Sequence, residues 1–256
     1  MATVTWTNKT PSAISATLEI VGFYSGKSVP AGAHSAIEVA LGKNYKQLLS
    51  RLNFEGKAES TILLDGSKRA VLVVGLGDPK KLTMPILRKA SAHAGRAASS
   101  FGSAVASYGI AASKVLDANE VATGMLEGFN LGTYVYDSYK KSNKIDLKKV
   151  IVSDVTKAST VAAFKRSAAI CEGVLWAREA INTPPNAKAP KALAADIQKL
   201  FKSSVVKVTV LDEAAIKKKK MAGVMAVGQG SENRPRFVRL SYRAPGAKKT
   251  LAFVGK

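Results

Sequence analysis

Ala70-Val71-Leu72-Val73-Val74, followed by Gly75-Leu76-Gly77, is the stretch of sequence that decides the fold. An apolar run rich in valine that ends in a glycine turn predicts a β-strand. A helix follows it, because Thr83-Met84-Pro85 can cap and open a helix whose apolar residues recur with a period near 3.6 as far as Phe101. A strand that leads into an amphipathic helix predicts an α/β fold.

Similar patterns extend this prediction in both directions. Four further segments have the composition of strands: Ala16–Tyr24, Ser60–Leu64, Val105–Ile110 and Lys149–Val155. Because they alternate with helical patterns, the sequence predicts an N-terminal α/β domain over residues 1–155.

A second α/β domain is predicted over residues 156–256. A long helical pattern runs from Ser159 to Ile181 and ends at Thr183-Pro184-Pro185, since proline cannot continue a helix. Another helix is expected from Pro190, and Asp212 can cap a short helix that extends to Lys220. The predicted strands of this domain are Val205–Leu211, Val224–Val227, Phe237–Tyr242 and Leu251–Val254.

The last of these strands belongs to the segment Thr250-Leu251-Ala252-Phe253-Val254-Gly255-Lys256. Four consecutive apolar residues are typical of a central strand in a parallel sheet, where both faces are covered. Such a strand normally leads to a functional loop. We therefore expect the second domain to be truncated, with its sheet incomplete and its chemistry beyond Lys256.

Composition bounds the class of protein. The 256 residues are 46% apolar, which is enough for sizeable cores, but no apolar stretch approaches the roughly 20 residues of a transmembrane helix. The first 20 residues hold one lysine and no arginine, which disfavours a secretory or mitochondrial signal. Cys171 is the single cysteine and fits a reducing compartment. We expect a cytoplasmic protein with no membrane association.

The formal net charge of +21 is the strongest anomaly, because 39 Lys and Arg face 18 Asp and Glu. Residues 183–256 hold 16 basic and 4 acidic residues, so the excess is concentrated there. Three explanations stay open: a surface that binds nucleic acid through phosphates, an acidic remainder of the protein that is missing, or a solvated basic face without a partner.

Several residues could carry chemistry, and each has a simpler structural interpretation. Gly75-Leu76-Gly77 lacks the third glycine of a dinucleotide-binding loop, so a turn at a strand exit is favoured. His34 and His93 have no ligand partners at metal-binding spacing, which favours solvated histidines over a zinc site. Cys171 lies on an apolar helix stripe and is expected in the core. Lys217–Lys220 fits a solvated helix end better than a phosphate site.

Some longer segments, taken together, resemble those of the leucyl aminopeptidase family. The most specific is Trp176-Ala-Arg-Glu-Ala-Ile-Asn-Thr-Pro-Pro-Asn186, which is similar to the helix-to-loop segment that opens the family's catalytic domain. The other matching segments are Gly128–Lys140, Gly223–Ser231, Arg234-Pro235-Arg236 and Leu240-Ser241-Tyr242. Their order and spacing follow the family, and the resemblance covers most of the chain.

The resemblance implies a cytosolic exopeptidase that releases N-terminal amino acids from peptides and assembles as a hexamer. It implies a macro-like N-terminal α/β domain and a catalytic domain that holds two divalent metal ions, zinc or manganese. Val254-Gly255-Lys256 matches the family segment whose lysine is the first metal ligand, so Lys256 is the candidate ligand. Such a lysine would coordinate as the neutral amine.

The family's other ligands and its catalytic residues follow this lysine, so the resemblance places them beyond residue 256. The carboxylates that are present after Thr183 match none of them: Asp196, Asp212, Glu213 and Glu232. The sequence therefore predicts that these 256 residues alone are inactive and bind no metal stably. The alternatives are a non-catalytic structural or assembly protein of the same fold, and a nucleic-acid-binding relative.

Overall fold

The computed structural model describes residues 2–26, 29–66, 68–108, 115–139, 147–153 and 155–255. Its contacts divide the chain into two units, Met1–Ala177 and Arg178–Lys256. The boundary falls inside one long helix, whereas the sequence predicted a change of domain at residue 155. The domain boundary predicted at residue 155 therefore stays a prediction.

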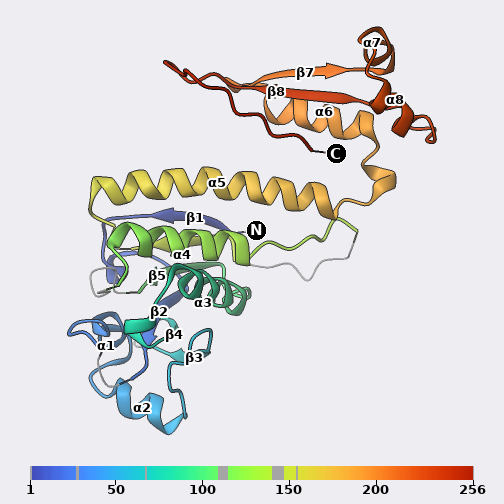
Figure 1. Cartoon of the computed structure of the whole chain (residues 1–256). Helices are drawn as coiled ribbons and strands as arrows, with labels where there is room; N and C mark the ends of the chain where they lie inside the picture. Colours follow the sequence, from blue (N-terminus) through green and yellow to red (C-terminus); the bar gives the residue numbers. More distant parts are fainter. Residues whose placement is uncertain are drawn as a thin grey trace. The chain divides into compact units, whose positions relative to one another are not determined.

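A six-stranded sheet organises the first unit (Figure 1). In spatial order its strands are β1 (Thr3–Trp6), β6 (Lys149–Val152), β5 (Ser103–Ser107), β2 (Leu18–Tyr24), β4 (Ala70–Gly77) and β3 (Thr61–Asp65). All neighbours are parallel except β3, which pairs antiparallel with β4 at the edge. The four predicted strands of this region and the Ala70 strand are thus present, although Ile110, the predicted end of one of them, lies outside the described residues.

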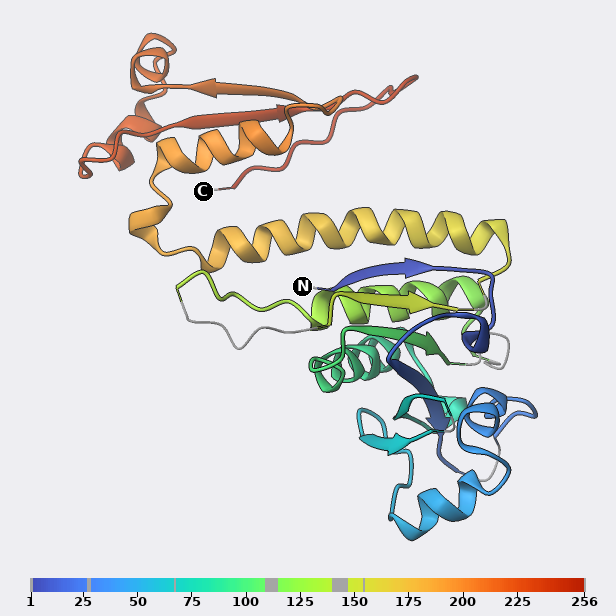
Figure 2. The same cartoon turned by 180° about the vertical axis from the view of Figure 1, so that it is seen from behind.

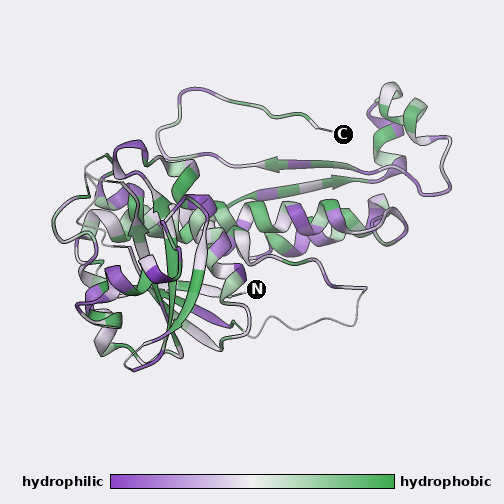
Figure 3. Cartoon of the chain, turned by 90° about the horizontal axis from the view of Figure 1, so that it is seen from below, coloured by the Kyte–Doolittle hydropathy of each residue, from purple (hydrophilic) through white to green (hydrophobic). Residues whose placement is uncertain are grey.

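Strand β4 explains why the Ala70 run is continuously apolar. Its side chains alternate between two cores: Leu72 and Val74 face one, and Val71 and Val73 face the other. Both faces are covered by helices, so neither face favours polar residues. Figure 3 shows hydrophobic residues along the central strands of this sheet.

Five α-helices accompany the sheet: α1 (Ser35–Leu41), α2 (Tyr45–Arg51), α3 (Met84–Ala97), α4 (Ala118–Gly132) and α5 (Ala158–Asn182). Residues of α1 and α2 belong to the smaller core, and residues of α3, α4 and α5 to the larger one. The helix predicted after Thr83 is α3. Thr83 has the extended backbone of an N-cap residue but makes no side-chain cap hydrogen bond.

Helices α3 and α4 approach each other closely because α4 presents a glycine at every fourth position. These are Gly124, Gly128 and Gly132, which share one face of the helix. A Cβ added at Gly128 would lie 2.4 Å from the backbone oxygen of Arg88 in α3. The main chain of α3 therefore occupies the space that any side chain at Gly128 would need.

Helix α5 joins the larger core through Phe164 and Cys171, which are both buried. The Phe164 ring lies 4.8 Å from the ring of Trp6 in β1, and α5 runs alongside β1 in both views of the chain (Figures 1 and 2). The prediction that Cys171 is a core residue is confirmed.

The second unit is smaller and has few buried side chains. Its elements are the 3-10 helix η4 (Pro185–Ala187), α6 (Pro190–Leu200), β7 (Lys207–Leu211), α7 (Glu213–Lys218), α8 (Ala222–Gly228) and β8 (Phe237–Ser241). Strands β7 and β8 form an antiparallel pair in which Leu211 lies opposite Phe237. The helix from Pro190, the Asp212-capped helix and the strands near 205–211 and 237–242 are as predicted.

Two predicted strands of this unit are wrong. Val224–Val227 lies inside helix α8, because a short apolar run without alternation is compatible with either structure and Met225 and Ala226 favour the helix. Leu251–Val254 forms no strand: Phe253 is 91% exposed and Val254 is 98% exposed. A strand needs a hydrogen-bonded neighbour, and within the described residues β8 pairs with β7 alone.

Candidate functional site

The end of α5, which carries the most specific family resemblance, is stabilised by side chains of the loop that follows. The Thr183 hydroxyl donates to the Glu179 carbonyl at 2.8 Å. The Lys188 ammonium donates to the carbonyls of Ala180 at 2.6 Å and Ile181 at 3.2 Å. Carbonyls in the last turn of a helix lack intrahelical partners, so these bonds fix where α5 stops.

Two carboxylates of the second unit, those of Asp212 and Glu213, serve local structure. Asp212 caps α7 by accepting a hydrogen bond from the Ala215 amide at 2.9 Å, as its position predicted. Glu213 pairs with Lys217 at 2.7 Å and with Arg234 at 3.5 Å. The hydrogen bond from Lys217 lowers the pKa of Glu213, so this carboxyl group is held in its charged form.

These residues do not fit a centre for two divalent metal ions. Among the residues that the structure describes, no three His, Cys, Asp or Glu side chains come together in a way that could hold a metal ion. Divalent cations of this kind need several converging donors. Lys256, the predicted first ligand, lies outside the described residues.

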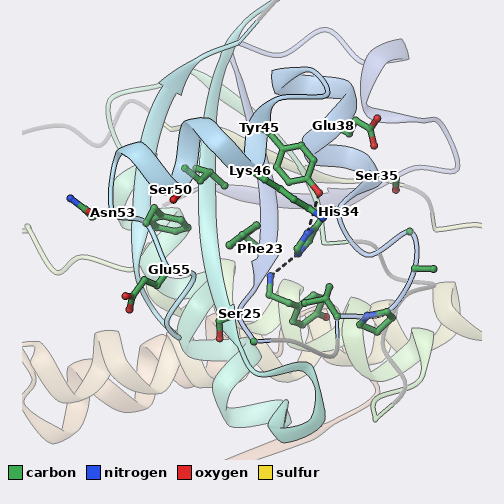
Figure 4. Close-up of a pocket in the computed structure, with 18 residues that line it drawn as sticks. Phe23, Ser25, His34, Ser35, Glu38, Tyr45, Lys46, Ser50, Asn53 and Glu55 are labelled. Carbon is green, nitrogen blue, oxygen red and sulfur yellow. Dashed lines mark hydrogen bonds between the residues drawn. The ribbon is translucent and has the colours of Figure 1, made fainter.

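A recess with a partly polar lining lies in the first unit, beside the carboxyl end of β2 (Figure 4). It has a volume of about 770 Å³. Its walls include five aromatic or imidazole rings, which belong to Phe23, Tyr24, His34, Tyr45 and Phe54. Its polar and charged lining residues are Ser25, Ser35, Glu38, Lys46, Ser50, Asn53 and Glu55.

His34 links β2 and α2 at this recess, because each of its ring nitrogens makes a hydrogen bond. The backbone amide of Tyr24 donates to Nε2 at 3.1 Å, so Nε2 is the unprotonated nitrogen. Nδ1 therefore carries the hydrogen and donates it to the Tyr45 hydroxyl oxygen at 3.3 Å. Tyr45 accepts this bond and keeps its own hydroxyl hydrogen as a donor. The Phe23 ring stacks on the imidazole with the ring centres 4.5 Å apart.

The prediction that His34 is a solvated loop residue is wrong, because the side chain is buried between β2 and α2. Burial lowers its pKa to about 4, and the positive charge of Lys46 acts in the same direction. Its partners stand 10 and 11 positions away in the sequence, and no local spacing identifies them.

Acidification is expected to destabilise the first unit through His34. In the unfolded chain this residue binds a proton near its ordinary pKa of 6.5, but in the folded chain only near 4. The unfolded state therefore binds more protons between these values, and the stability present at neutral pH is lost as the pH falls through them. We expect a loss of about 2 kcal/mol, allowing for solvent screening.

Urea unfolding at several pH values between about 7 and 4 measures this loss. Gln cannot be protonated in this range, so the advantage of the wild type over His34→Gln should shrink as the pH falls. His93→Gln, at a half-exposed position, is the matched variant that measures how much of the pH dependence comes from the other histidine. Identical pH profiles for the wild type and His34→Gln would contradict the assignment.

The contacts of His93 and Lys217–Lys220, two other candidates from the sequence, are explained by local structure. His93 is half-exposed and lies 3.2 Å from Glu59, a carboxylate distant in sequence, and Lys89 lies 3.8 Å from the same carboxylate. Two donors around one carboxylate, with no third ligand, do not make a zinc site. Lys217–Lys220 lies at the end of α7, where lysines suit the negative end of the helix dipole.

The glycines of Gly75-Leu76-Gly77 serve the packing of a neighbouring segment. Gly75 donates to the carbonyl of Ser60 at 2.8 Å, and a Cβ at Gly75 would lie 2.0 Å from the carbonyl oxygen of Lys57. Gly77 donates to the carbonyl of Gly56 at 3.0 Å. Residues 56–60 thus pass directly over the end of β4, which leaves no room for a phosphate-binding loop.

Two regions of the chain match models of one protein family. Two family models match in order along the chain: "Cytosol aminopeptidase family, N-terminal domain" over residues 20–143 and "Cytosol aminopeptidase family, catalytic domain" over residues 175–256. The chain belongs to the cytosol aminopeptidase family. All the segments that carried the sequence resemblance lie within these two matches.

Curated members of the cytosol aminopeptidase family align with nearly the whole chain. A probable cytosol aminopeptidase of Streptomyces coelicolor is 36% identical, with 90% of this chain and 48% of the relative covered. One from Rhodococcus opacus is 33% identical, with 93% of this chain and 48% of the relative covered. The chain thus spans about half the length of the curated relatives it matches.

Solved structures agree on the fold. The bottromycin maturation enzyme BotP in complex with Mn superposes with a TM-score of 0.75 at 26% identity, over 90% of this chain and 46% of that chain. A mutant of tomato leucine aminopeptidase gives 0.74 at 22% identity, over 97% and 52%. These likenesses confirm the predicted α/β architecture. In the described parts of the chain, no helix has both the length and the apolar content needed to cross a bilayer.

Proposed function

We propose that the protein is an aminopeptidase that releases N-terminal amino acids from peptides with two divalent metal ions, zinc or manganese. The observation that carries this proposal is the match of both family domains, in their family order, on one chain. The manganese complex of BotP supports the use of divalent metals. When bound, such ions polarise the scissile carbonyl and supply a hydroxide nucleophile near neutral pH.

We propose further that the metal ligands other than Lys256 lie in a region of the protein that corresponds to the half of the relatives that this sequence does not span. The described residues hold no cluster that fits a metal ion, and the family relatives are about twice as long. What this chain supplies is the N-terminal unit and the elements α6 to β8 of the catalytic unit. We expect the 256 residues alone to be inactive, and the protein in its source to be cytoplasmic and hexameric.

Release of leucine from leucyl-p-nitroanilide tests the proposed activity. Protein purified from its source should hydrolyse this substrate, and removal of metal with a chelator should lower the rate by at least about a hundredfold, because the metals generate the nucleophile. Added manganese or zinc should restore the rate. Activity that a chelator leaves unchanged would overturn the two-metal mechanism.

Binding to nucleic acid is a second candidate, favoured by the 16 basic and 4 acidic residues of positions 183–256. Contacts between these cations and phosphates would release counterions, so affinity should fall steeply with salt. We expect duplex DNA to bind at low ionic strength and to lose at least about tenfold in affinity between 50 and 200 mM salt. Absence of binding at low salt would exclude this role.

A further inference from the structure

The recess beside β2 combines apolar walls with charges of both signs. The Phe23 and Phe54 rings lie 6.0 Å apart and tilted at 49°, and together with Tyr45 they provide aromatic surface. Small-molecule sites typically occupy about 300–1,000 Å³ and pair such walls with a few polar groups, and the 770 Å³ recess falls in that range.

One end of the recess carries donors. The ammonium of Lys46 lies 5.9 Å from the centre of the Tyr45 ring, so this cation sits close to the phenol. Tyr45 retains its hydroxyl hydrogen, because His34 donates to its oxygen. A cation and a hydroxyl donor at neighbouring positions are suited to a carboxylate.

The recess also carries acceptors. Glu38 lines the recess, and its charge acts after burial in raising the pKa of Tyr45. Glu55 also lines the recess but is paired with Lys57 at 2.8 Å. Glu38 makes no ion pair with another described residue, so it is the lining carboxylate available to a positively charged group.

We propose that this recess binds a zwitterionic α-amino acid with an apolar, preferably aromatic, side chain, either free or at the end of a short peptide. The carboxylate would bind Lys46 and the Tyr45 hydroxyl, the ammonium would bind Glu38, and the side chain would pack against the exposed surface of Phe23 and Phe54. Among the described lining residues, the cation Lys46 stands against the two carboxylates Glu38 and Glu55, which disfavours a polyphosphate.

Calorimetric titration of the 256-residue chain with L-phenylalanine tests the proposal directly. We expect saturable binding at one site per chain. N-acetyl-L-phenylalaninamide has the same ring but neither charge, and should bind at least about tenfold more weakly. L-phenylalanyl-L-phenylalanine separates the two sources: tighter binding than the free amino acid identifies a peptide end as the ligand, and weaker binding identifies the free amino acid.

Two variants locate the site. Lys46→Met keeps the aliphatic stem and removes the charge, and Glu38→Gln keeps the shape and removes the charge. Both positions are exposed, so the fold should be unaffected, and each variant should bind L-phenylalanine about tenfold more weakly. Lys43→Met, at an exposed lysine outside the lining, should bind like the wild type.

No saturable binding of either charged probe would overturn the proposal, as would equal binding of the uncharged amide. Unchanged affinity in both Lys46→Met and Glu38→Gln would overturn it as well. The titration reports binding to the first unit and no catalytic rate, so its failure is distinct from failure of the proposed aminopeptidase function.

Discussion

Replacing Phe164 with alanine is expected to lower the free energy of unfolding of the first unit by about 4 kcal/mol. The side chain is completely buried, contacts the ring of Trp6 and belongs to the core that covers one face of the sheet. The substitution loses the transfer free energy of the phenyl ring and leaves a cavity that the neighbouring helices fill incompletely. Urea unfolding followed by circular dichroism measures the change.

Ile170→Ala on the same helix is the matched control, because Ile170 is 53% exposed and should cost less than about 1 kcal/mol. The pair also tests where the first unit ends. If α5 stabilises this unit, Phe164→Ala destabilises it strongly; similar small effects of both variants would favour the domain boundary predicted at residue 155.

Gly128→Ala should cost about 3 kcal/mol, although alanine is the better helix former. The added methyl group would meet the Arg88 carbonyl oxygen at 2.4 Å and the Ser91 Cβ at 2.5 Å. The first of these atoms is backbone, so relief requires α3 and α4 to move apart and open the core between them.

Gly173→Ala in α5 provides the control for this substitution. Nothing lies within 4 Å of a Cβ at Gly173, so the same change should be neutral or stabilise by up to about 1 kcal/mol. Thermal unfolding of both variants measures the contrast. A Gly128→Ala variant as stable as Gly173→Ala would show that α3 and α4 are not closely packed at this point.

The sequence predicted much of the first unit because its signals are local. The Ala70 run is buried on both faces, and the long helix before Pro184 ends where proline forbids continuation. Each of these features depends on residues that are adjacent or one helical turn apart. The α/β class followed from such patterns, whereas the family resemblance rested on longer segments such as Trp176–Asn186; the comparisons with known proteins support both.

The errors arose where structure depends on distant partners. Val224–Val227 and Leu251–Val254 have similar apolar runs, yet one is a helix and the other forms no regular element. Met225 and Ala226 favour the helix in the first segment, and the second has no neighbouring strand among the described residues to pair with. His34 was assigned to solvent because Tyr24 and Tyr45 become its partners only in the folded chain.

In the proposed function, the residues described here and the metal ligands belong to different regions of the protein. The described residues build the first unit and the opening elements of the catalytic unit, and they offer a recess for a small ligand but no metal centre. The proposed aminopeptidase chemistry therefore depends on metal ligands that the described residues do not provide.

Titration with Mn²⁺ tests that central claim most directly. The 256-residue chain should show no saturable binding of Mn²⁺ up to about 1 mM, because at least three converging donors are required and the described residues lack them. Protein purified from its source should bind two ions per chain. Stoichiometric binding of two Mn²⁺ ions by the 256-residue chain would contradict the account.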